Sequence, residues 1–267
     1  MKAARFEYRR ATTAQDAAAL LSGTPDSKVL AGGQSLGPML NLRLARPALL
    51  VDITRIPGLK HIAIEGPHIV LGAGVTHAMI EDGAIPAAAG PVAAMLQSIA
   101  GGIAYRAVRT RGTVGGSLAH ADPAADWMTA LIALDAELIL RGARKSRVLP
   151  LTGFMVGAFA TVLETDEIIE AVRVPKLSVD ARWGYYKVWR KTGEFAHALA
   201  AAVVDPARKS ARAVMGATDG APKVLDIEAA RRDPTGAVVA AAPAFDDYAI
   251  EVHAAAVRRA LTQVYPS

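Results

Sequence analysis

Val29-Leu30-Ala31-Gly32-Gly33-Gln34-Ser35-Leu36 is the stretch on which the predicted fold depends. A short apolar run leads into two adjacent glycines, and small polar residues follow them. Paired glycines, which lack a Cβ atom, allow positive φ and a close approach of the main chain to a ligand. Successive N–H groups in such a turn point into one concavity, which suits a pyrophosphate. A short helix beginning near Leu36 would add the partial positive charge of its N-terminus.

A second stretch, Thr113-Val114-Gly115-Gly116-Ser117, repeats this pattern far downstream. A single glycine pair is a weak signal, because most such pairs only close a loop. Two matched pairs at the ends of apolar runs indicate a shared site more strongly. We therefore expect both stretches to form glycine turns with positive φ and to converge on one diphosphate.

Two further segments, Ser117–Asp126 and Tyr185–Lys187, extend the pattern. Together with the glycine stretches they resemble the FAD-binding medium subunits of the molybdenum hydroxylases. This family includes the partners of carbon monoxide dehydrogenase and of the bacterial xanthine, nicotine and aromatic-acid dehydrogenases. The resemblance covers nearly the whole chain, and its linked motifs are specific as a set. Ser117 is a departure, since many relatives carry asparagine there, but its hydroxyl still suits a phosphate.

The resemblance implies an α+β protein with the vanillyl-alcohol-oxidase-like (PCMH-type) FAD-binding fold. Two α/β subdomains, residues 1–55 and 56–176, would clamp an extended FAD. A small α+β C-terminal domain, residues 177–267, would complete the flavoprotein subunit.

The local patterns predict elements compatible with this division. In the first segment, a helix capped by Thr13 and two buried strands indicate a mixed sheet. A β-hairpin is expected around Gly66-Pro67. In the last segment, a helix is expected over 248–264, whereas Asp233–Pro243 is interpreted as a loose loop. Further strands are expected at 28–31, 48–53, 136–141, 146–151, 168–174, 183–189, 199–204 and 211–217.

The residues that the resemblance assigns to FAD fall into three groups. The first glycine stretch contributes Lys28, Val29, Leu30, Ala31, Gly32, Gly33, Gln34, Ser35 and Leu36. The second contributes Thr113, Val114, Gly115, Gly116 and Ser117. The remaining residues are His120, Asp126, Leu163, Ile169, Tyr185 and Lys187.

Specific roles follow for some of the third group, each with an ordinary structural alternative. Asp126 would lie near the adenosine, or would simply cap a helix. Main-chain groups of Ile169 would meet the pyrimidine edge of the isoalloxazine, with Leu163 packing nearby. Tyr185 would lie near the ring face, although a strand tyrosine is more often half-buried packing. A cation at Lys187 would favour an anionic reduced flavin. The acidic run 164–170 is interpreted as a solvated turn.

The composition excludes several classes of protein. The 267 residues contain no cysteine, which excludes disulfides, thiolate zinc sites, cysteine nucleophiles and cysteine-ligated iron–sulfur clusters in this chain. The six histidines lack ligand spacing, so no metal site is expected. No nucleophile–base pair emerges, and no catalytic residue is assigned, because the flavin would carry the redox chemistry. Arg106, Arg109 and Arg111 form the densest basic patch, which favours a ligand phosphate or a partner surface over nucleic acid.

The resemblance implies an oxidoreductase subunit in a larger complex. Electrons would leave a molybdenum cofactor on a large subunit, cross two-iron two-sulfur clusters on a small subunit, and reach FAD and then an external acceptor. A dimer of heterotrimers is expected. The alternatives are a stand-alone FAD-dependent oxidoreductase and a non-catalytic nucleotide-binding assembly module. The sequence has no signal peptide and no run of about 20 apolar residues, so a cytoplasmic location is expected. The alternative is peripheral attachment to the inner membrane through partner chains.

Overall fold

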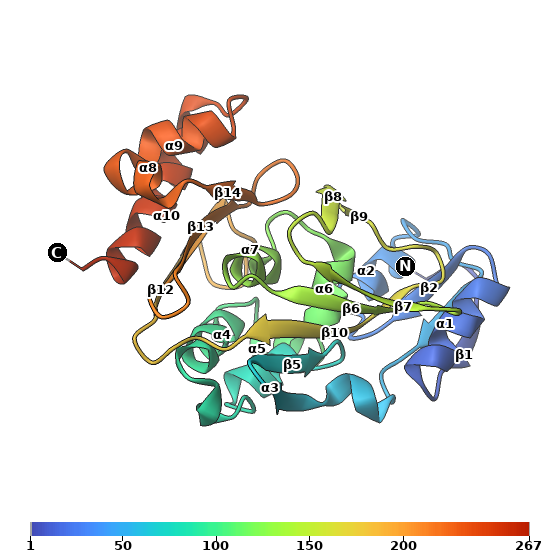
Figure 1. The fold of residues 1–267 in the computed structure, drawn as a ribbon. Helices are drawn as coiled ribbons and strands as arrows, with labels where there is room; N and C mark the ends of the chain where they lie inside the picture. Colours follow the sequence, from blue (N-terminus) through green and yellow to red (C-terminus); the bar gives the residue numbers. More distant parts are fainter. Residues whose placement is uncertain (1, 267) are drawn as a thin grey trace.

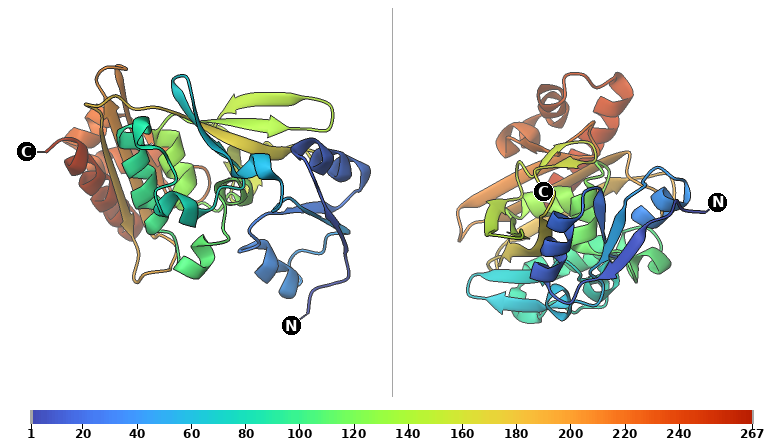
Figure 2. Two further views of the ribbon diagram at one scale, coloured as in Figure 1. Left: turned by 90° about the horizontal axis from the view of Figure 1, so that it is seen from below. Right: turned by 90° about the vertical axis from the view of Figure 1, so that its right-hand side faces the viewer.

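The computed structural model describes residues 2–266, which form three main β-sheets, a small two-stranded ribbon and surrounding helices (Figure 1). The N-terminal unit and the C-terminal helices lie at opposite ends of the molecule in Figure 1 and in the left view of Figure 2. Each main sheet draws its strands from one of the segments 1–55, 56–176 and 177–267. The exact boundaries between those segments stay a prediction.

The first sheet is entirely parallel, with the order β1-β3-β2. Its strands are β1 (Glu7–Arg10), β2 (Ser27–Leu30) and β3 (Leu49–Asp52), and α1 (Ala14–Gly23) and α2 (Leu36–Asn41) connect them. The expected mixed sheet is wrong, because each helical crossover returns the chain in the same direction. The cap at Thr13 is confirmed: its hydroxyl accepts from the Asp16 N–H at 3.0 Å.

The second sheet is antiparallel and has the order β4-β5-β10-β6-β7. The predicted hairpin is confirmed as β4 (Ile62–Glu65) and β5 (His68–Gly72). The other strands are β6 (Glu137–Arg141), β7 (Ser146–Pro150) and β10 (Ile168–Pro175), and the ribbon consists of β8 (Met155–Gly157) and β9 (Ala160–Thr161). The helices are α3 (His77–Glu81), α4 (Pro91–Gly101), α5 (Arg106–Arg109), α6 (Val114–His120) and α7 (Asp126–Ala133), with short 3₁₀ turns at Pro57–Lys60 and Ala87–Ala89.

The third sheet has the order β11-β12-β13-β14 and lies between helices. Its strands are β11 (Arg182–Val188), β12 (Ala198–Asp205), β13 (Ser210–Gly216) and β14 (Lys223–Leu225). The helix α10 (Asp247–Val264) covers one face, while α4 and α7 pack on the other (Figure 1). Two shorter helices, α8 (Ile227–Arg232) and α9 (Pro234–Ala241), join β14 to α10.

One expectation for irregular structure is wrong, and a second is confirmed only in part. The segment expected to be a loose loop contains α9, because Asp233 accepts from the Gly236 N–H at 3.0 Å and Pro234 occupies the first turn. The acidic run 164–170 has exposed residues at Glu164 and Thr165 and a turn over 165–166, as expected, but not all of its acids are solvated. Glu167 is buried and binds Arg147 Nε at 2.7 Å, which holds the pKa of Glu167 below its usual value.

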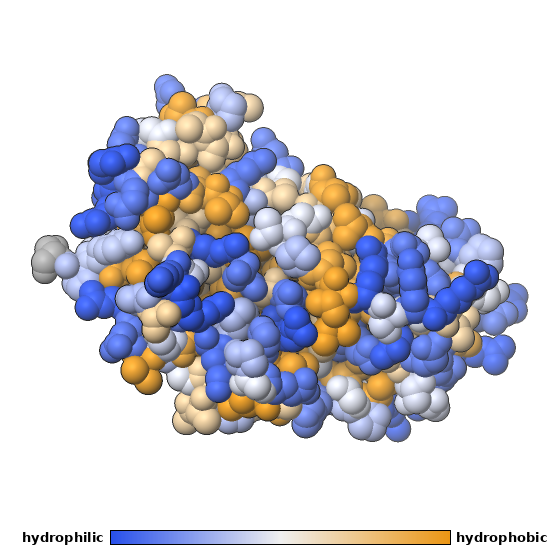
Figure 3. Space-filling view, viewed as in Figure 1, coloured by the Kyte–Doolittle hydropathy of each residue, from blue (hydrophilic) through white to orange (hydrophobic). Residues whose placement is uncertain are grey.

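The surface combines charged regions with apolar ones. Figure 3 shows apolar surface gathered over β7–β9, where Val148, Val156 and Phe159 are exposed. Within residues 2–266, no helix has the length and apolar character needed to cross a membrane.

Candidate functional site

The first glycine stretch contacts the segment immediately before the second. A Cβ atom on Gly32 would lie 2.0 Å from the carbonyl oxygen of Arg111 and 2.9 Å from the Cα atom of Gly112. A Cβ on Gly116 would lie 3.6 Å from the Cβ of Ala31. Only glycine at position 32 allows this approach, so the two stretches lie side by side. One diphosphate shared between them requires this arrangement.

The turn after Gly32 presents main-chain N–H groups without protein partners. Gly33 has φ of 72°, and Ser35 follows in the right-handed helical region. No acceptor among residues 2–266 takes the N–H groups of Gly33, Gln34 or Ser35. Such a run of free N–H groups forms an anion-binding nest.

The second glycine stretch does not form a positive-φ turn, so that expectation is wrong. It begins α6, and the Thr113 hydroxyl accepts from the Gly116 N–H at 3.0 Å. The N–H groups of Val114 and Gly115 donate to Val75 and Ala73 carbonyls at 3.0 and 2.9 Å. Gly115 is needed for packing, since a Cβ there would lie 2.4 Å from the Ala73 Cβ. The second stretch therefore supports the site, while the first supplies its free donors.

A cleft of about 460 Å³ opens where the two segments meet. It lies at the carboxyl ends of β1, β2 and β3, the edge of a parallel α/β sheet at which ligands bind. Its walls include Gly32, Thr113 and the basic side chains of Arg55, Lys60 and Arg111. In the described part of the chain, none of these three cations has a carboxylate partner.

One carboxylate also lines this cleft. Asp52 accepts hydrogen bonds from the Tyr8 hydroxyl, the Arg10 guanidinium and the Thr54 N–H. Burial alone would raise the pKa of Asp52, but these hydrogen bonds hold it below its ordinary value. Asp52 is therefore an ionised acid whose charge is already compensated, and the cleft keeps an excess of positive charge.

The basic patch predicted from the sequence divides between two roles. Arg106 and Arg109 bind Glu81, with Arg109 Nε 2.8 Å from Glu81 Oε2, and Arg106 also binds Asp82. Hydrogen bonds from these arginines lower the pKa of Glu81. Only Arg111 of the patch lines the cleft, where its Nε also donates to the Gly32 carbonyl at 3.4 Å.

A second polar cluster joins three of the predicted site residues. Lys187 Nζ lies 2.9 and 3.0 Å from the two Asp126 oxygens, and the Tyr185 hydroxyl donates to Asp126 Oδ1 at 2.6 Å. Tyr185 and Lys187 are two residues apart on β11 and so share one face. Burial and the Asp126 charge raise the pKa of Tyr185 well above its ordinary value.

This cluster changes the interpretation of its members. The capping alternative for Asp126 is wrong, because Ala125 occupies the cap position of α7 and the Asp126 carboxylate points to β11 instead. Because Tyr185 and Lys187 both hydrogen-bond to Asp126, the three side chains lie at one position along any extended ligand. The three side chains therefore form one cluster, although the resemblance assigned Asp126 to the adenosine and the other two to the isoalloxazine.

Two of the remaining predicted residues, His120 and Ile169, lie on α6 and β10, whereas Leu163 lies between β9 and β10. His120 ends α6, and its ring centroid lies 5.1 Å from that of Phe159. Ile169 is buried in β10, against which α6 packs. The Leu163 N–H donates to the Thr161 hydroxyl at 3.3 Å.

Arg55 and Lys60 were not among the residues predicted from the sequence. Their signal was present, because both follow the end of the buried strand β3, and residues after parallel strands gather at one edge. Within residues 2–266, no group of three metal-binding side chains occurs.

His77 contacts Gly112, which directly precedes the second glycine stretch. It is buried, its Nδ1 accepts from Trp127 Nε1 at 3.0 Å, and its main-chain N–H donates to Gly112 at 3.0 Å. Burial, aided by the charge of Arg109, lowers the pKa of His77 from 6.5 to about 4. His77 is therefore neutral at physiological pH.

We expect His77 to make the protein sensitive to mild acid. Its folded-state pKa lies below the unfolded value, so its contribution is complete above pH 6.5 and is lost as the pH falls toward 4. The loss amounts to about 3 kcal/mol at most. His77→Gln keeps an acceptor for Trp127 but does not titrate. Urea unfolding at pH 7 and pH 5 should therefore show a smaller drop for this variant, and equal drops would contradict the assignment.

Comparisons of sequence place the chain among known proteins. A family model described as the FAD binding domain in molybdopterin dehydrogenase matches residues 4–177. The carbon monoxide dehydrogenase medium chain of Hydrogenophaga pseudoflava is 39% identical over 232 residues, 85% of this chain and 79% of that protein. The nicotine 6-hydroxylase medium subunit of Paenarthrobacter nicotinovorans is 37% identical over 221 residues, 83% of this chain and 76% of that protein.

Solved structures agree with this placement. Carbon monoxide dehydrogenase from Hydrogenophaga pseudoflava, in a form lacking the Mo-pyranopterin moiety, matches with a TM-score of 0.91 and 34% identity over 99% of both chains. Quinoline 2-oxidoreductase from Pseudomonas putida 86 matches with a TM-score of 0.88 and 28% identity over 99% of this chain and 98% of the other. The predicted α+β, PCMH-type fold is confirmed. The chain belongs to the family of FAD-binding medium subunits of the molybdenum hydroxylases.

Proposed function

We propose that this chain binds FAD and passes electrons within a molybdenum hydroxylase. Its partners are a large subunit with the molybdenum cofactor and a small subunit with two-iron two-sulfur clusters, assembled as a dimer of heterotrimers. The complete absence of cysteine supports this division of labour, because such clusters need thiolate ligands from another chain. FAD, when bound, accepts two electrons and releases them singly or as a hydride.

The observation that carries the proposal is the approach of Gly32 to Arg111. It brings the N–H groups of Gly33, Gln34 and Ser35 close to a cleft with three cations, and within residues 2–266 the donors have no acceptor and the cations have no carboxylate partner. A doubly charged diphosphate fits both features, since main-chain donors orient its oxygens and the cations offset its charge. The close main-chain approach at Gly32, which a Cβ atom would prevent, also suits a tightly held ligand.

The remaining site residues keep their proposed roles, with one revision. We assign the Asp126, Lys187 and Tyr185 cluster to a single end of the cofactor. There it holds a buried positive charge in a defined position. Ile169, Leu163 and His120 stay assigned to walls of the cofactor site. The complex is placed in the cytoplasm, and peripheral attachment to a membrane would arise through its partners.

The test is the visible spectrum of the complex purified through a tag on this chain. Flavin bands at about one FAD per chain, with molybdenum and iron in the same fraction, are expected. A yellow chain that purifies alone would favour the stand-alone oxidoreductase. A colourless chain that takes up no added FAD would favour the assembly module and overturn the proposal.

Arg111→Ala tests the charge of the cleft. Removing this exposed cation is expected to weaken FAD binding about tenfold, because one charge-assisted contact to the diphosphate is lost. The dissociation constant is measured by flavin fluorescence during titration of the FAD-depleted complex. Arg144→Ala, at an exposed residue outside the cleft, is the control. Equal affinity for the Arg111 variant and this control would remove Arg111 from the site.

A further inference from the structure

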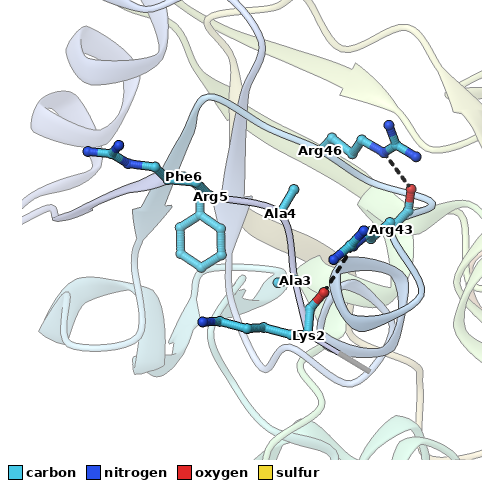
Figure 4. Close-up of a pocket in the computed structure, with 7 residues that line it drawn as sticks. All are labelled: Lys2, Ala3, Ala4, Arg5, Phe6, Arg43 and Arg46. Atoms are coloured by element: carbon cyan, nitrogen blue, oxygen red, sulfur yellow. Dashed lines mark hydrogen bonds between the residues drawn. The ribbon is translucent and has the colours of Figure 1, made fainter.

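A second basic cleft lies in the N-terminal unit and is separate from the diphosphate site. It measures about 830 Å³ and is lined by residues 2–6 together with Arg43 and Arg46 (Figure 4). Its lining contains four cations, Lys2, Arg5, Arg43 and Arg46, and no carboxylate. None of these cations forms an ion pair within residues 2–266. The two clefts have no lining residue in common.

Two of the three arginines of this cleft, Arg43 and Arg46, are held by the main chain. Arg43 Nε donates to the Lys2 carbonyl at 3.1 Å, and Arg46 Nε donates to the Arg43 carbonyl at 3.1 Å (Figure 4). Each bond occupies only Nε, which leaves the terminal nitrogens for a ligand. Arg43 also has φ of 59°, a left-handed conformation that costs a non-glycine residue about 1 kcal/mol. Backbone strain of this kind clusters at binding sites.

Exposed apolar side chains stand on both sides of Arg43 in the sequence. Leu42 and Leu44 are 49% and 73% exposed and flank Arg43 in sequence. A single exposed leucine needs no explanation. Two of them alternating with fixed arginines in one short loop offer apolar contact beside charge, and arginine is enriched in protein–protein interfaces where lysine is depleted.

We propose that this N-terminal cleft docks an acidic segment of a partner subunit in the assembled complex. The inference rests on the proposed function, because it needs the partner chains. Carboxylates complement a lining with four cations and no acid, and arginine binds them in a bidentate fork. An anionic membrane surface is the alternative occupant, because it also attracts clusters of exposed lysine and arginine, and the experiment below distinguishes the two.

The experiment compares two charge-removing double variants in the full complex. Arg43→Gln with Arg46→Gln alters the cleft, whereas Arg208→Gln with Lys209→Gln removes two exposed cations from the β12–β13 turn. The pairs are matched, since Lys209 also has a positive φ, of 50°. Each complex is captured through a tag on the molybdenum subunit, and the amount of this chain is measured against increasing salt.

At 0.15 M salt, the amount of the cleft variant captured with the molybdenum subunit is expected to be about a tenth of the wild-type amount. The control variant is expected to be captured as well as wild type. Circular dichroism of each chain checks folding. Should the cleft variant not fold, carbodiimide treatment of the wild-type complex replaces it, with an amide between Lys2 and a partner carboxylate as the expected product and no such product as the contrary one.

Equal capture of all three complexes would overturn the docking proposal. If, in addition, the cleft variant no longer sedimented with phosphatidylglycerol vesicles while the wild-type complex did, the cleft would be assigned to a membrane. These outcomes differ from failure of the proposed function. In that case, the wild-type chain itself would carry no FAD and bring down no partner.

Discussion

Gly32→Ala is expected to leave the purified complex with less than about a tenth of its FAD. The added Cβ would lie 2.0 Å from the carbonyl oxygen of Arg111 and 2.6 Å from its carbonyl carbon. Main-chain atoms of a neighbouring segment cannot yield as a flexible side chain can. The two segments must therefore separate, and the nest at Gly33–Ser35 then loses its position beside the basic cleft.

The FAD content is measured as the ratio of flavin to protein absorbance after gel filtration. Gly23→Ala is the matched control, because Gly23 ends α1 and a Cβ there meets no atom within 4 Å. Gly33→Ala separates strain from clash, since its Cβ meets only the Leu30 side chain at 3.3 Å, although φ is 72°. A Gly32 variant that melts like wild type and still holds one FAD per chain would refute the shared diphosphate site.

Lys187→Met is expected to destabilise the protein by about 3–5 kcal/mol. Both side chains of the Lys187–Asp126 ion pair are only 6% exposed. Removing the ammonium leaves the Asp126 carboxylate buried, with the Tyr185 hydroxyl as its remaining side-chain donor. An uncompensated charge in the interior costs far more than the loss of an exposed pair.

Urea unfolding followed by tryptophan fluorescence measures this effect. Lys191→Met is the control, because the Lys191 side chain is 72% exposed and its removal should change stability by less than about 0.5 kcal/mol. The double variant Lys187→Met with Asp126→Leu removes both charges and should recover much of the loss. Similar stability of the Lys187 and Lys191 variants would show that the Lys187–Asp126 pair adds little.

Local signals in the sequence predicted most of the elements. The helix after Thr13 and the hairpin at Gly66-Pro67 depend on neighbouring residues, so a short window contains the information. The same window failed at Thr113–Ser117. A glycine pair serves a free turn and a packed helix start equally well, and the difference lies in the carbonyls of Ala73 and Val75, which are distant in sequence.

The family, the two glycine motifs and the lack of any cysteine to ligate an iron–sulfur cluster could be read from the sequence. Those conclusions depend on residue identity and short spacing, which do not require coordinates. Three-dimensional packing was needed to show that Gly32 meets Arg111, 79 residues away, and that Asp126 binds Lys187, 61 residues away. Such contacts arise from how sheets and helices pack, and a local pattern does not encode which distant side chain will occupy the space beside it.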